Sequence, residues 1–170
     1  MFKKYFFGLS LKIGIVGALG HILYFFVFYF METPPCDKVF VFDFWIPTIF
    51  IFLTIKFYRD KLNAGELRFW QGLSLGVQVL FWTSFLAAFV LLIYLTWFDA
   101  SFFTDCMDSF RQYNLSIKEQ VIKAHGKEAY DVATKEIEKI TQFSLVVKKF
   151  LISFFVNIIS ILLFSVLFRR

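Results

Sequence analysis

Few residues in this sequence have the types and spacing that catalysis needs. Residues 72–76 read GLSLG and match the G-x-S-x-G pattern of serine hydrolases, in which a turn between a strand and a helix exposes the serine. Here the pattern opens a long apolar segment, which favours a helix instead. Gly72 and Gly76 then lie one turn apart, the spacing at which small residues let membrane helices approach closely. We therefore interpret the motif as a helix contact and expect no catalytic residue.

The residues that bind metals or form disulfides are few and widely separated. The chain has two histidines, His21 and His125, and two cysteines, Cys36 and Cys106. This set lacks the ligand spacing of zinc sites, and no phosphate-binding or dinucleotide-binding motif occurs, so we expect no metal and no cofactor. The two cysteines could form a disulfide in an oxidising exterior. Two free thiols are slightly favoured, because the sequence does not show that their Cα atoms come within about 7 Å.

The composition indicates a membrane protein. Of the 170 residues, 59% are hydrophobic and 27 are phenylalanine, whereas soluble domains hold about 45–50% apolar residues. A chain of this size cannot bury such an excess in its own core. Four apolar segments approach or exceed the roughly 20 residues that cross a bilayer as a helix: 13–31, 39–57, 73–98 and 150–168. They are too long and too uniformly apolar for barrel strands. The predicted fold class is therefore an all-α membrane protein, a single domain built as a four-transmembrane-helix bundle.

The distribution of charge predicts the orientation. Residues 99–149 hold eight basic and eight acidic side chains, so the net charge of +5 comes from the rest of the chain. Basic residues near apolar spans are typical of cytoplasmic loops and of contact with anionic lipid, and we expect no nucleic-acid partner. The positive-inside rule then predicts cytoplasmic termini and an extracytoplasmic helical insertion at 99–149. Lys148 and Lys149, at the outer end of the fourth span, contradict this bias.

The insertion at 99–149 shows helical signals. Ser116 and Glu119 match a capping box, Gly126 is a plausible helix end, and a second helix is expected from about Lys127. Its apolar positions recur at helical spacing: Ala129, Val132, Ala133, Ile137 and Ile140. The favoured interpretation is an amphipathic hairpin on the membrane or on the other helices. The alternative is a docking surface for a partner.

Small and polar residues within the spans predict where the helices meet. Gly14, Gly17, Ala18 and His21 share one face of the first span. We expect His21 and Asn157 to face the bundle interior, where they could hydrogen-bond to each other. Ionisable residues in membranes are candidates for proton or solute paths. A single histidine without a deep carboxylate favours local polar packing, since the other nearby charge, Asp43, is expected to reach the headgroups.

A short segment carries a family resemblance. Residues 56–72 read KFYRDKLNAGELRFWQG. A span ending in YRDK, a glycine turn and GEL-x-F-x-QG before a long apolar span resemble the DUF4199 family, small uncharacterised membrane proteins mainly from Bacteroidetes. Ala64 stands where we would expect a second glycine. The resemblance implies a bacterial inner membrane location and supplies no catalytic residues. The candidates for a cytoplasmic contact in this loop are Arg59, Asp60, Lys61 and Glu66.

The predicted function is a non-enzymatic accessory or scaffold protein that acts through helix association. Its partners would be the lipid bilayer and another membrane protein or a second copy of the chain. The alternative is a component of a small-solute transporter or channel, in which His21, Gln78 and Asn157 would line a common cavity. A membrane enzyme is less favoured, and it would need carboxylates or histidines clustered at one membrane face.

Overall fold

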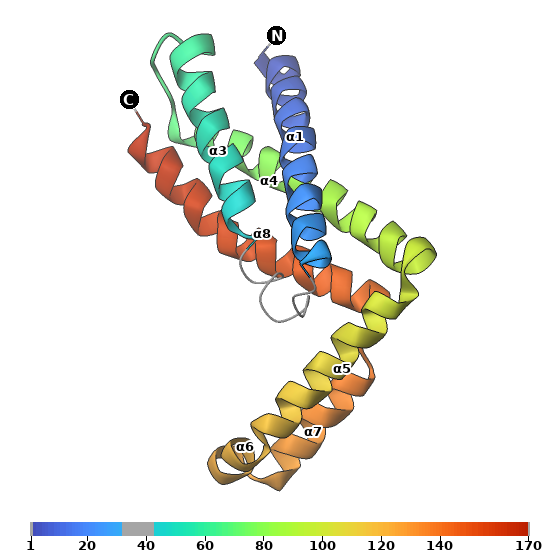
Figure 1. The fold of residues 1–170 in the computed structure, drawn as a ribbon. Helices are drawn as coiled ribbons and strands as arrows, with labels where there is room; N and C mark the ends of the chain where they lie inside the picture. The colour runs from blue at the N-terminus through green and yellow to red at the C-terminus, as the bar shows by residue number, and fades with distance from the viewer. Residues whose placement is uncertain (1, 32–42, 170) are drawn as a thin grey trace.

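The computed structural model describes residues 2–31 and 43–169, and these residues form helices and turns without any strand. Four helices pack side by side as a bundle (Figure 1): α1 (Phe2–Phe30), α3 (Trp45–Phe57), α4 (Phe69–Ile93) and α8 (Gln142–Leu167). Single π-helical turns, Tyr58–Leu62 and Tyr94–Phe98, continue α3 and α4. Three further helices form a lobe: α5 (Ala100–Ser116), α6 (Lys118–His125) and α7 (Lys127–Glu138).

The bundle has two distinct ends. The free ends of α1 and α8 and the turn between α3 and α4 lie together, while the lobe projects from the opposite end (Figure 1). We call these the terminal end and the lobe end. Helices α3 and α4 each contact the three other helices of the bundle, so both are shared packing partners within it.

Among the residues that the structure describes, three helical segments are long and apolar enough to cross a membrane: Phe6–Phe30, Phe69–Phe98 and Gln142–Leu167. The second predicted span, 39–57, begins at residues outside the described part, and its described helix α3 has only 13 residues. The fourth span was predicted to begin at residue 150, but its helix begins at Gln142. Lys148 and Lys149 are therefore part of this helix and do not precede it.

The bundle core divides into two apolar clusters. At the terminal end, the fully buried side chains are Ile51, Ile55, Leu67, Leu75, Val79, Leu80 and Ile161. At the lobe end, the second cluster joins the bundle to α5 and contains Phe25, Leu91, Leu95, Phe102, Cys106, Leu145 and Val146. Large apolar side chains outside both clusters, such as Leu23 and Ile159, are exposed along the spans, as expected for helices that lipid surrounds.

Small residues lie where α4 meets its neighbours. A Cβ atom added to Gly14 of α1 would lie 2.4 Å from Cβ of Trp82, and the nearby Thr83 hydroxyl donates a 3.4 Å hydrogen bond to the Gly14 carbonyl. A Cβ on Gly76 would lie 2.7 Å from Cγ2 of Ile161 in α8. Gly17 and Gly72 make similarly close contacts with α4 and α8, and Ala18 is buried.

The lobe differs in detail from the sequence expectation. Its first helix, α5, was not predicted. The capping box at Ser116 is wrong: α6 begins after Ile117, and the Ser116 hydroxyl donates to the Tyr113 carbonyl instead. Gly126 ends α6 with a φ of 86° and α7 starts at Lys127, as predicted.

The face of α7 that packs in the lobe only partly matches the predicted apolar positions. Tyr130 is buried, and the Asn114 amide of α5 donates a 2.9 Å hydrogen bond to the Thr134 hydroxyl. Among the predicted apolar positions, Ile137 and Ile140 are partly buried, whereas Val132 is 60% exposed. The inner face of α7 therefore combines Tyr130 and Thr134 with aliphatic residues, and a pattern based on aliphatic residues alone does not detect the first two.

Replacing Gly14 with alanine is expected to destabilise the bundle by about 1–3 kcal/mol, the usual effect of overpacking a tight contact. The new methyl group would meet the Cβ of Trp82 and the backbone of Thr83, which cannot move independently of α4. Thermal unfolding in detergent measures the effect. Gly8→Ala is the matched control in the same helix, because its Cβ would meet no atom within 4 Å. Equal melting temperatures for the two variants would contradict the close α1–α4 contact.

Candidate functional site

Three ionisable side chains from distant parts of the chain meet in the lobe-end half of the bundle. His21 lies on α1, Asp43 lies in the turn before α3, and Lys149 lies on α8. The Asp43 carboxylate is 2.7 Å from Nζ of Lys149 and 3.4 Å from Nδ1 of His21. We call this group the ion cluster.

The ion cluster is shielded from solvent. The Asp43 and His21 side chains are 4% and 6% exposed, and that of Lys149 is 17% exposed. A charged group in a low-dielectric interior is strongly disfavoured unless an opposite charge compensates it. The short contact between Asp43 and Lys149 provides that compensation, and it joins the start of α3 to α8.

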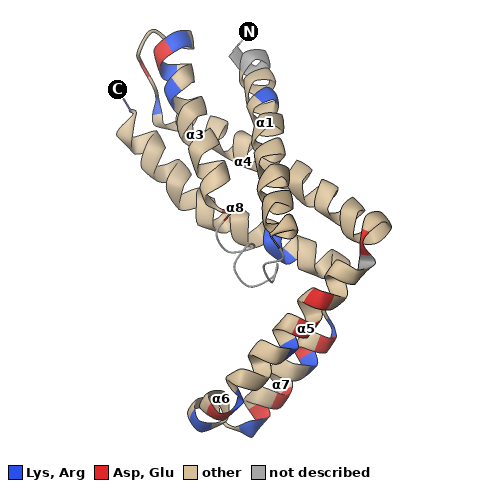
Figure 2. Ribbon diagram, in the orientation of Figure 1, with Lys and Arg blue, Asp and Glu red and all other residues tan. Residues whose placement is uncertain are grey.

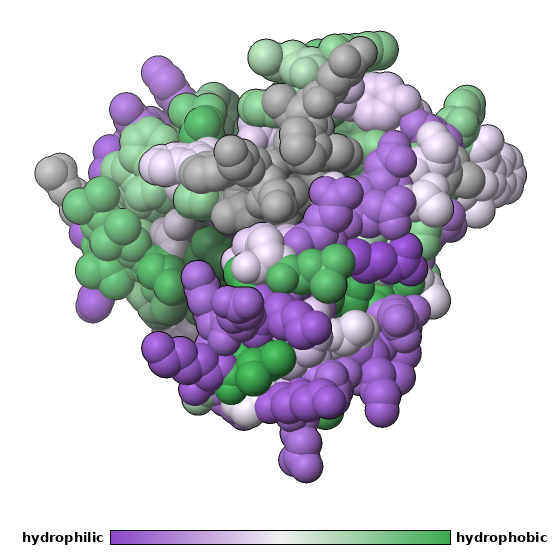
Figure 3. All heavy atoms as spheres, turned by 60° about the horizontal axis from the view of Figure 1, so that its bottom comes forward, coloured by the Kyte–Doolittle hydropathy of each residue, from purple (hydrophilic) through white to green (hydrophobic). Residues whose placement is uncertain are grey.

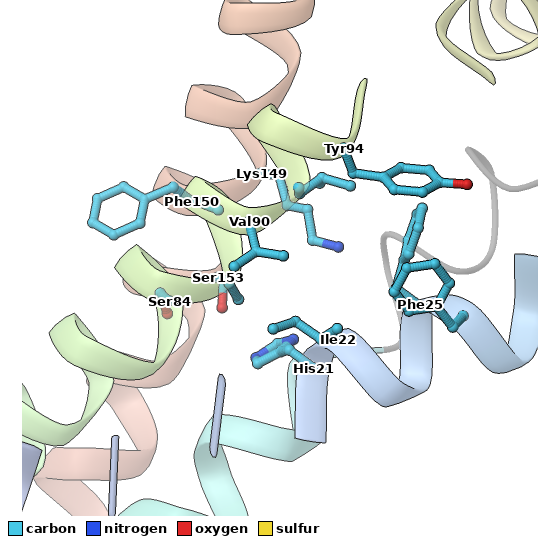
Figure 4. Close-up of a pocket in the computed structure, with 13 residues that line it drawn as sticks. His21, Ile22, Phe25, Ser84, Val90, Tyr94, Lys149, Phe150 and Ser153 are labelled. Carbon is cyan, nitrogen blue, oxygen red and sulfur yellow. The ribbon is translucent and has the colours of Figure 1, made fainter. Parts of the chain in front are cut away.

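A cavity lies against the ion cluster. It has a volume of about 40 Å³ and is lined by side chains of α1, α4 and α8, among them His21, Ser84, Lys149 and Ser153. Figure 4 shows these residues on the three helices that surround it. Within the described part of the chain, Nε2 of His21 and the hydroxyls of Ser84 and Ser153 are buried and have no hydrogen-bond partner.

A second and larger cavity lies between α8 and the lobe. Its volume is about 590 Å³, and Asp43, Lys148, Lys149 and Ser153 line it. The rest of its lining is mainly apolar and comes from α5, α7 and α8, including Phe110, Tyr113, Ile137, Ile140, Leu145, Ile152 and Val156. Lys149 and Ser153 line both cavities. The ion cluster therefore lies between a small, partly open cavity and a cleft at the lobe.

Asn157 is fully buried but belongs to a different contact. Its Oδ1 accepts a 2.7 Å hydrogen bond from the Thr48 hydroxyl, and its Nδ2 donates to the Ser153 carbonyl at 2.9 Å. The expected hydrogen bond between His21 and Asn157 is therefore wrong for this structure, since both polar groups of the amide have other partners. Asn157 joins α3 to α8 on the terminal-end side of the ion cluster.

Asp43 is buried beside His21. His21 therefore has a carboxylate partner, which the sequence analysis did not expect. Two unusual features of the sequence could have indicated the ion cluster. One is a carboxylate inside a predicted span, and the other is the pair of lysines at the outer end of the last predicted span. Opposite charges that each violate an apolar or topological pattern can compensate each other.

The turn at the terminal end combines ionic and conformational features. Arg59 donates a 2.6 Å hydrogen bond to Asp60, which lowers the pKa of that carboxyl, and its guanidinium lies 4.8 Å from the Phe168 ring centroid. Ala64 and Gly65 both have positive φ, at 51° and 85°. Glycine adopts this conformation without steric penalty, whereas alanine does not.

The other loop candidates have more limited roles. Lys61 and Glu66 are exposed, and the Glu66 carbonyl accepts a 2.6 Å hydrogen bond from the Asn63 amide. The Gln71 side chain accepts from the Arg68 backbone where α4 begins. Arg59 thus connects α3 to α8, and the remaining polar groups fix the turn.

The junction between bundle and lobe is held by polar contacts. Asp99 caps α5 by accepting from the Phe102 backbone, and it also accepts hydrogen bonds from the hydroxyls of Ser101 and Tyr29. These bonds stabilise the carboxylate and lower the pKa of Asp99. The Gln142 side chain donates to the Leu95 carbonyl at 3.3 Å.

Cys106 lies buried in the same junction and is disulfide-bonded. The expectation of two free thiols is therefore wrong for Cys106. The only other cysteine of the chain, Cys36, lies outside the described residues. Burial beside Phe102 and Leu145 places Cys106 in the apolar cluster at the lobe end.

Several other candidates are not brought together. Ser74 is exposed on helix α4, and the strand-to-helix turn of a hydrolase is absent around it, since residues 69–93 are helical. Gln78 and Asn157 line neither cavity described above. Asp108 pairs with Arg111, and the described residues hold no group of three or more histidines, cysteines or carboxylates placed to bind a metal.

The fold and the cluster define an α-helical membrane protein, with three helices that can cross a bilayer and buried ionisable groups that compensate one another. The DUF4199 family, a family of proteins of unknown function, matches residues 12–170, and the chain belongs to this family. The resemblance of residues 56–72 is thereby confirmed. No curated protein and no solved structure matches the chain.

Lys149→Gln is expected to destabilise the protein by about 3–5 kcal/mol, because it leaves the Asp43 carboxylate buried without its cation. The adjacent variant Lys148→Gln is the control, since Lys148 is exposed and such substitutions usually change stability by less than about 0.5 kcal/mol. Melting temperatures in one detergent compare the two. A Lys149→Gln protein as stable as the Lys148→Gln protein would show that the ion pair does not hold α8 in place.

Cys106 is expected to resist thiol alkylation in the unfolded, unreduced protein and to react after reduction. Reduction, or Cys106→Ser, should lower stability by about 2–4 kcal/mol because the unfolded chain gains conformational freedom. Mass spectrometry of the alkylated protein measures the first effect and thermal unfolding the second. Alkylation of two thiols before reduction would contradict the bond.

Proposed function

We propose that this protein is a four-span protein of the inner cell membrane that acts without catalysis, as an accessory or scaffold protein associating with another membrane protein or with itself. The position of α3 supports a fourth span, since α3 lies beside α1, α4 and α8. It runs from near the lobe end to the turn at the terminal end (Figure 1), and Asp43 lies in the turn that precedes it. Its π-helical continuation to Leu62 extends the length available for crossing.

The charge pattern supports cytoplasmic termini. Basic residues gather at the terminal end (Figure 2), including Lys12, Lys56, Arg59, Lys61 and Arg68. Such residues are typical of the cytoplasmic side. The disulfide-bonded Cys106 lies at the lobe end, and disulfides persist in oxidising compartments. Both observations favour a lobe on the extracytoplasmic side.

The association proposal rests on the lobe, which projects from the membrane bundle and is attached to it. Tyr29, Gln142 and the apolar cluster around Phe102 attach the lobe to the bundle. Figure 3 shows apolar side chains between charged ones at this end of the molecule. Leu115 and Val132 are 63% and 60% exposed on it. A surface that is attached to the bundle and combines apolar with charged side chains is suited to binding a protein partner.

A second candidate function is a component of a small-solute transporter or channel. The ion cluster favours it, because ionisable groups within a membrane bundle are candidates for such paths. The terminal-end core opposes it: Ile51, Ile55, Leu75, Val79 and Ile161 are fully buried between the ion cluster and the terminal end. A buried apolar core therefore separates the cavities from the terminal end. This arrangement supports binding of a solute from the lobe side over passage of a solute across the bundle.

A photoreactive residue at position 132 tests the association proposal. Expressed at native level and irradiated in membranes, this variant is expected to recover one protein partner, or a second copy, in stoichiometric yield. The matched control carries the same photoreactive residue at Ile159, which is exposed on α8 and should capture mainly lipid. Mild-detergent purification and mass spectrometry identify the products.

Capture of no protein from the lobe would overturn the association proposal. In that case, solute flux in reconstituted vesicles, lost in a folded His21→Leu variant, would establish the transport function instead. The two results separate the candidates, because partner capture requires no flux and flux requires no partner.

A further inference from the structure

Three unpartnered polar atoms converge on the cavity between α1, α4 and α8. Nε2 of His21 and the hydroxyls of Ser84 and Ser153 lack partners among the described residues, and these residues are only 6%, 5% and 7% exposed. All three residues line this cavity (Figure 4). Leaving a buried polar group unsatisfied is strongly unfavourable. Such groups in native proteins are usually satisfied by buried water.

The size and lining of the cavity decide what it can hold. Its volume of about 40 Å³ accommodates roughly three water molecules, since each needs about 10–15 Å³ measured in this way. The polar atoms supply the two to four partners that a buried water requires. The remaining lining is largely apolar, including Phe25, Ala87 and Leu91. A dry acyl chain would leave all three polar atoms unsatisfied.

The orientation of His21 gives this water a chemical role. Nδ1 faces the Asp43 carboxylate at 3.4 Å, so the proton of the neutral imidazole is favoured there and the lone pair on Nε2 faces the cavity. A proton from cavity water can therefore bind at Nε2, and it returns to water when His21 becomes neutral again. No other atom needs to move.

We propose that this cavity is a binding site for a cluster of two or three ordered waters through which His21 exchanges protons with the lobe side of the membrane. The larger cleft at the lobe shares Lys149 and Ser153 with the cavity, which provides the route. The apolar core at the terminal end closes the other direction. The site therefore binds protons from one side without conducting them.

The charged and titratable groups around His21 determine how the local electrostatics change when His21 is protonated. Asp43 faces it from the turn before α3, and Lys149 approaches from α8. Tyr24 lies on α1, the helix that also carries His21, and Tyr94 lines the cavity from the π-helical turn that continues α4. With His21 neutral, the charges of Asp43 and Lys149 balance. Protonation adds one positive charge, which Asp43 attracts and Lys149 repels.

Nitrogen-15 labelling of histidine tests this proposal in the full-length protein. The chain contains two histidines, and exposed His125 in the lobe is an internal reference. In lipid nanodiscs, both imidazoles are expected to show magnetisation transfer from water. Ala87→Leu, which fills the cavity, should remove the water signal of His21 and leave that of His125 unchanged. Ala124→Leu, at an exposed position in α6, is the matched control.

Ser153→Ala provides a test that does not depend on filling the cavity. It removes one water partner without adding volume, and it is expected to weaken the water signal of His21 selectively. A folded protein in which His21 contacts lipid acyl chains, or shows no water contact while His125 shows it, would overturn the proposal.

Discussion

The pairing of Asp43 with Lys149 is the constraint on which the lobe half of the bundle depends. A carboxylate and an ammonium group in a low-dielectric interior are tolerated when they compensate each other, and here their atoms are 2.7 Å apart. The contact fixes the start of α3 against α8. His21 then brings α1 to the same carboxylate, so one acidic side chain organises three helices.

The terminal half of the bundle is organised by close packing. Gly14 and Gly17 bring α1 against α4, and Gly72 and Gly76 bring α4 against α8. Because lipid is as apolar as the helix surfaces, close packing of small residues replaces the hydrophobic driving force available in water. The bundle thus combines a tightly packed half with a half that contains charges and cavities, and the binding sites proposed above all belong to the second half or to the lobe.

The sequence predicted the features that follow from local pattern. Long apolar segments predicted the long helices, and the spacing of Gly72 and Gly76 agrees with the contact that α4 makes with α8. Gly126 marked a helix end correctly because its φ is positive. The ion cluster was not predicted, since it depends on three segments meeting in space. The inner face of α7 was predicted only in part, because Tyr130 and Thr134 pack through an aromatic ring and a hydroxyl.

The order of residues in the ion cluster has a consequence for how the protein is made. Asp43 precedes α3, but Lys149 belongs to the last helix, so α4 and the whole lobe are synthesised between them. During biosynthesis the carboxylate has His21 as its only neighbour from the cluster until α8 emerges. The first helices would thus remain incompletely assembled near the translocon, and release into the lipid phase would follow the arrival of the last one.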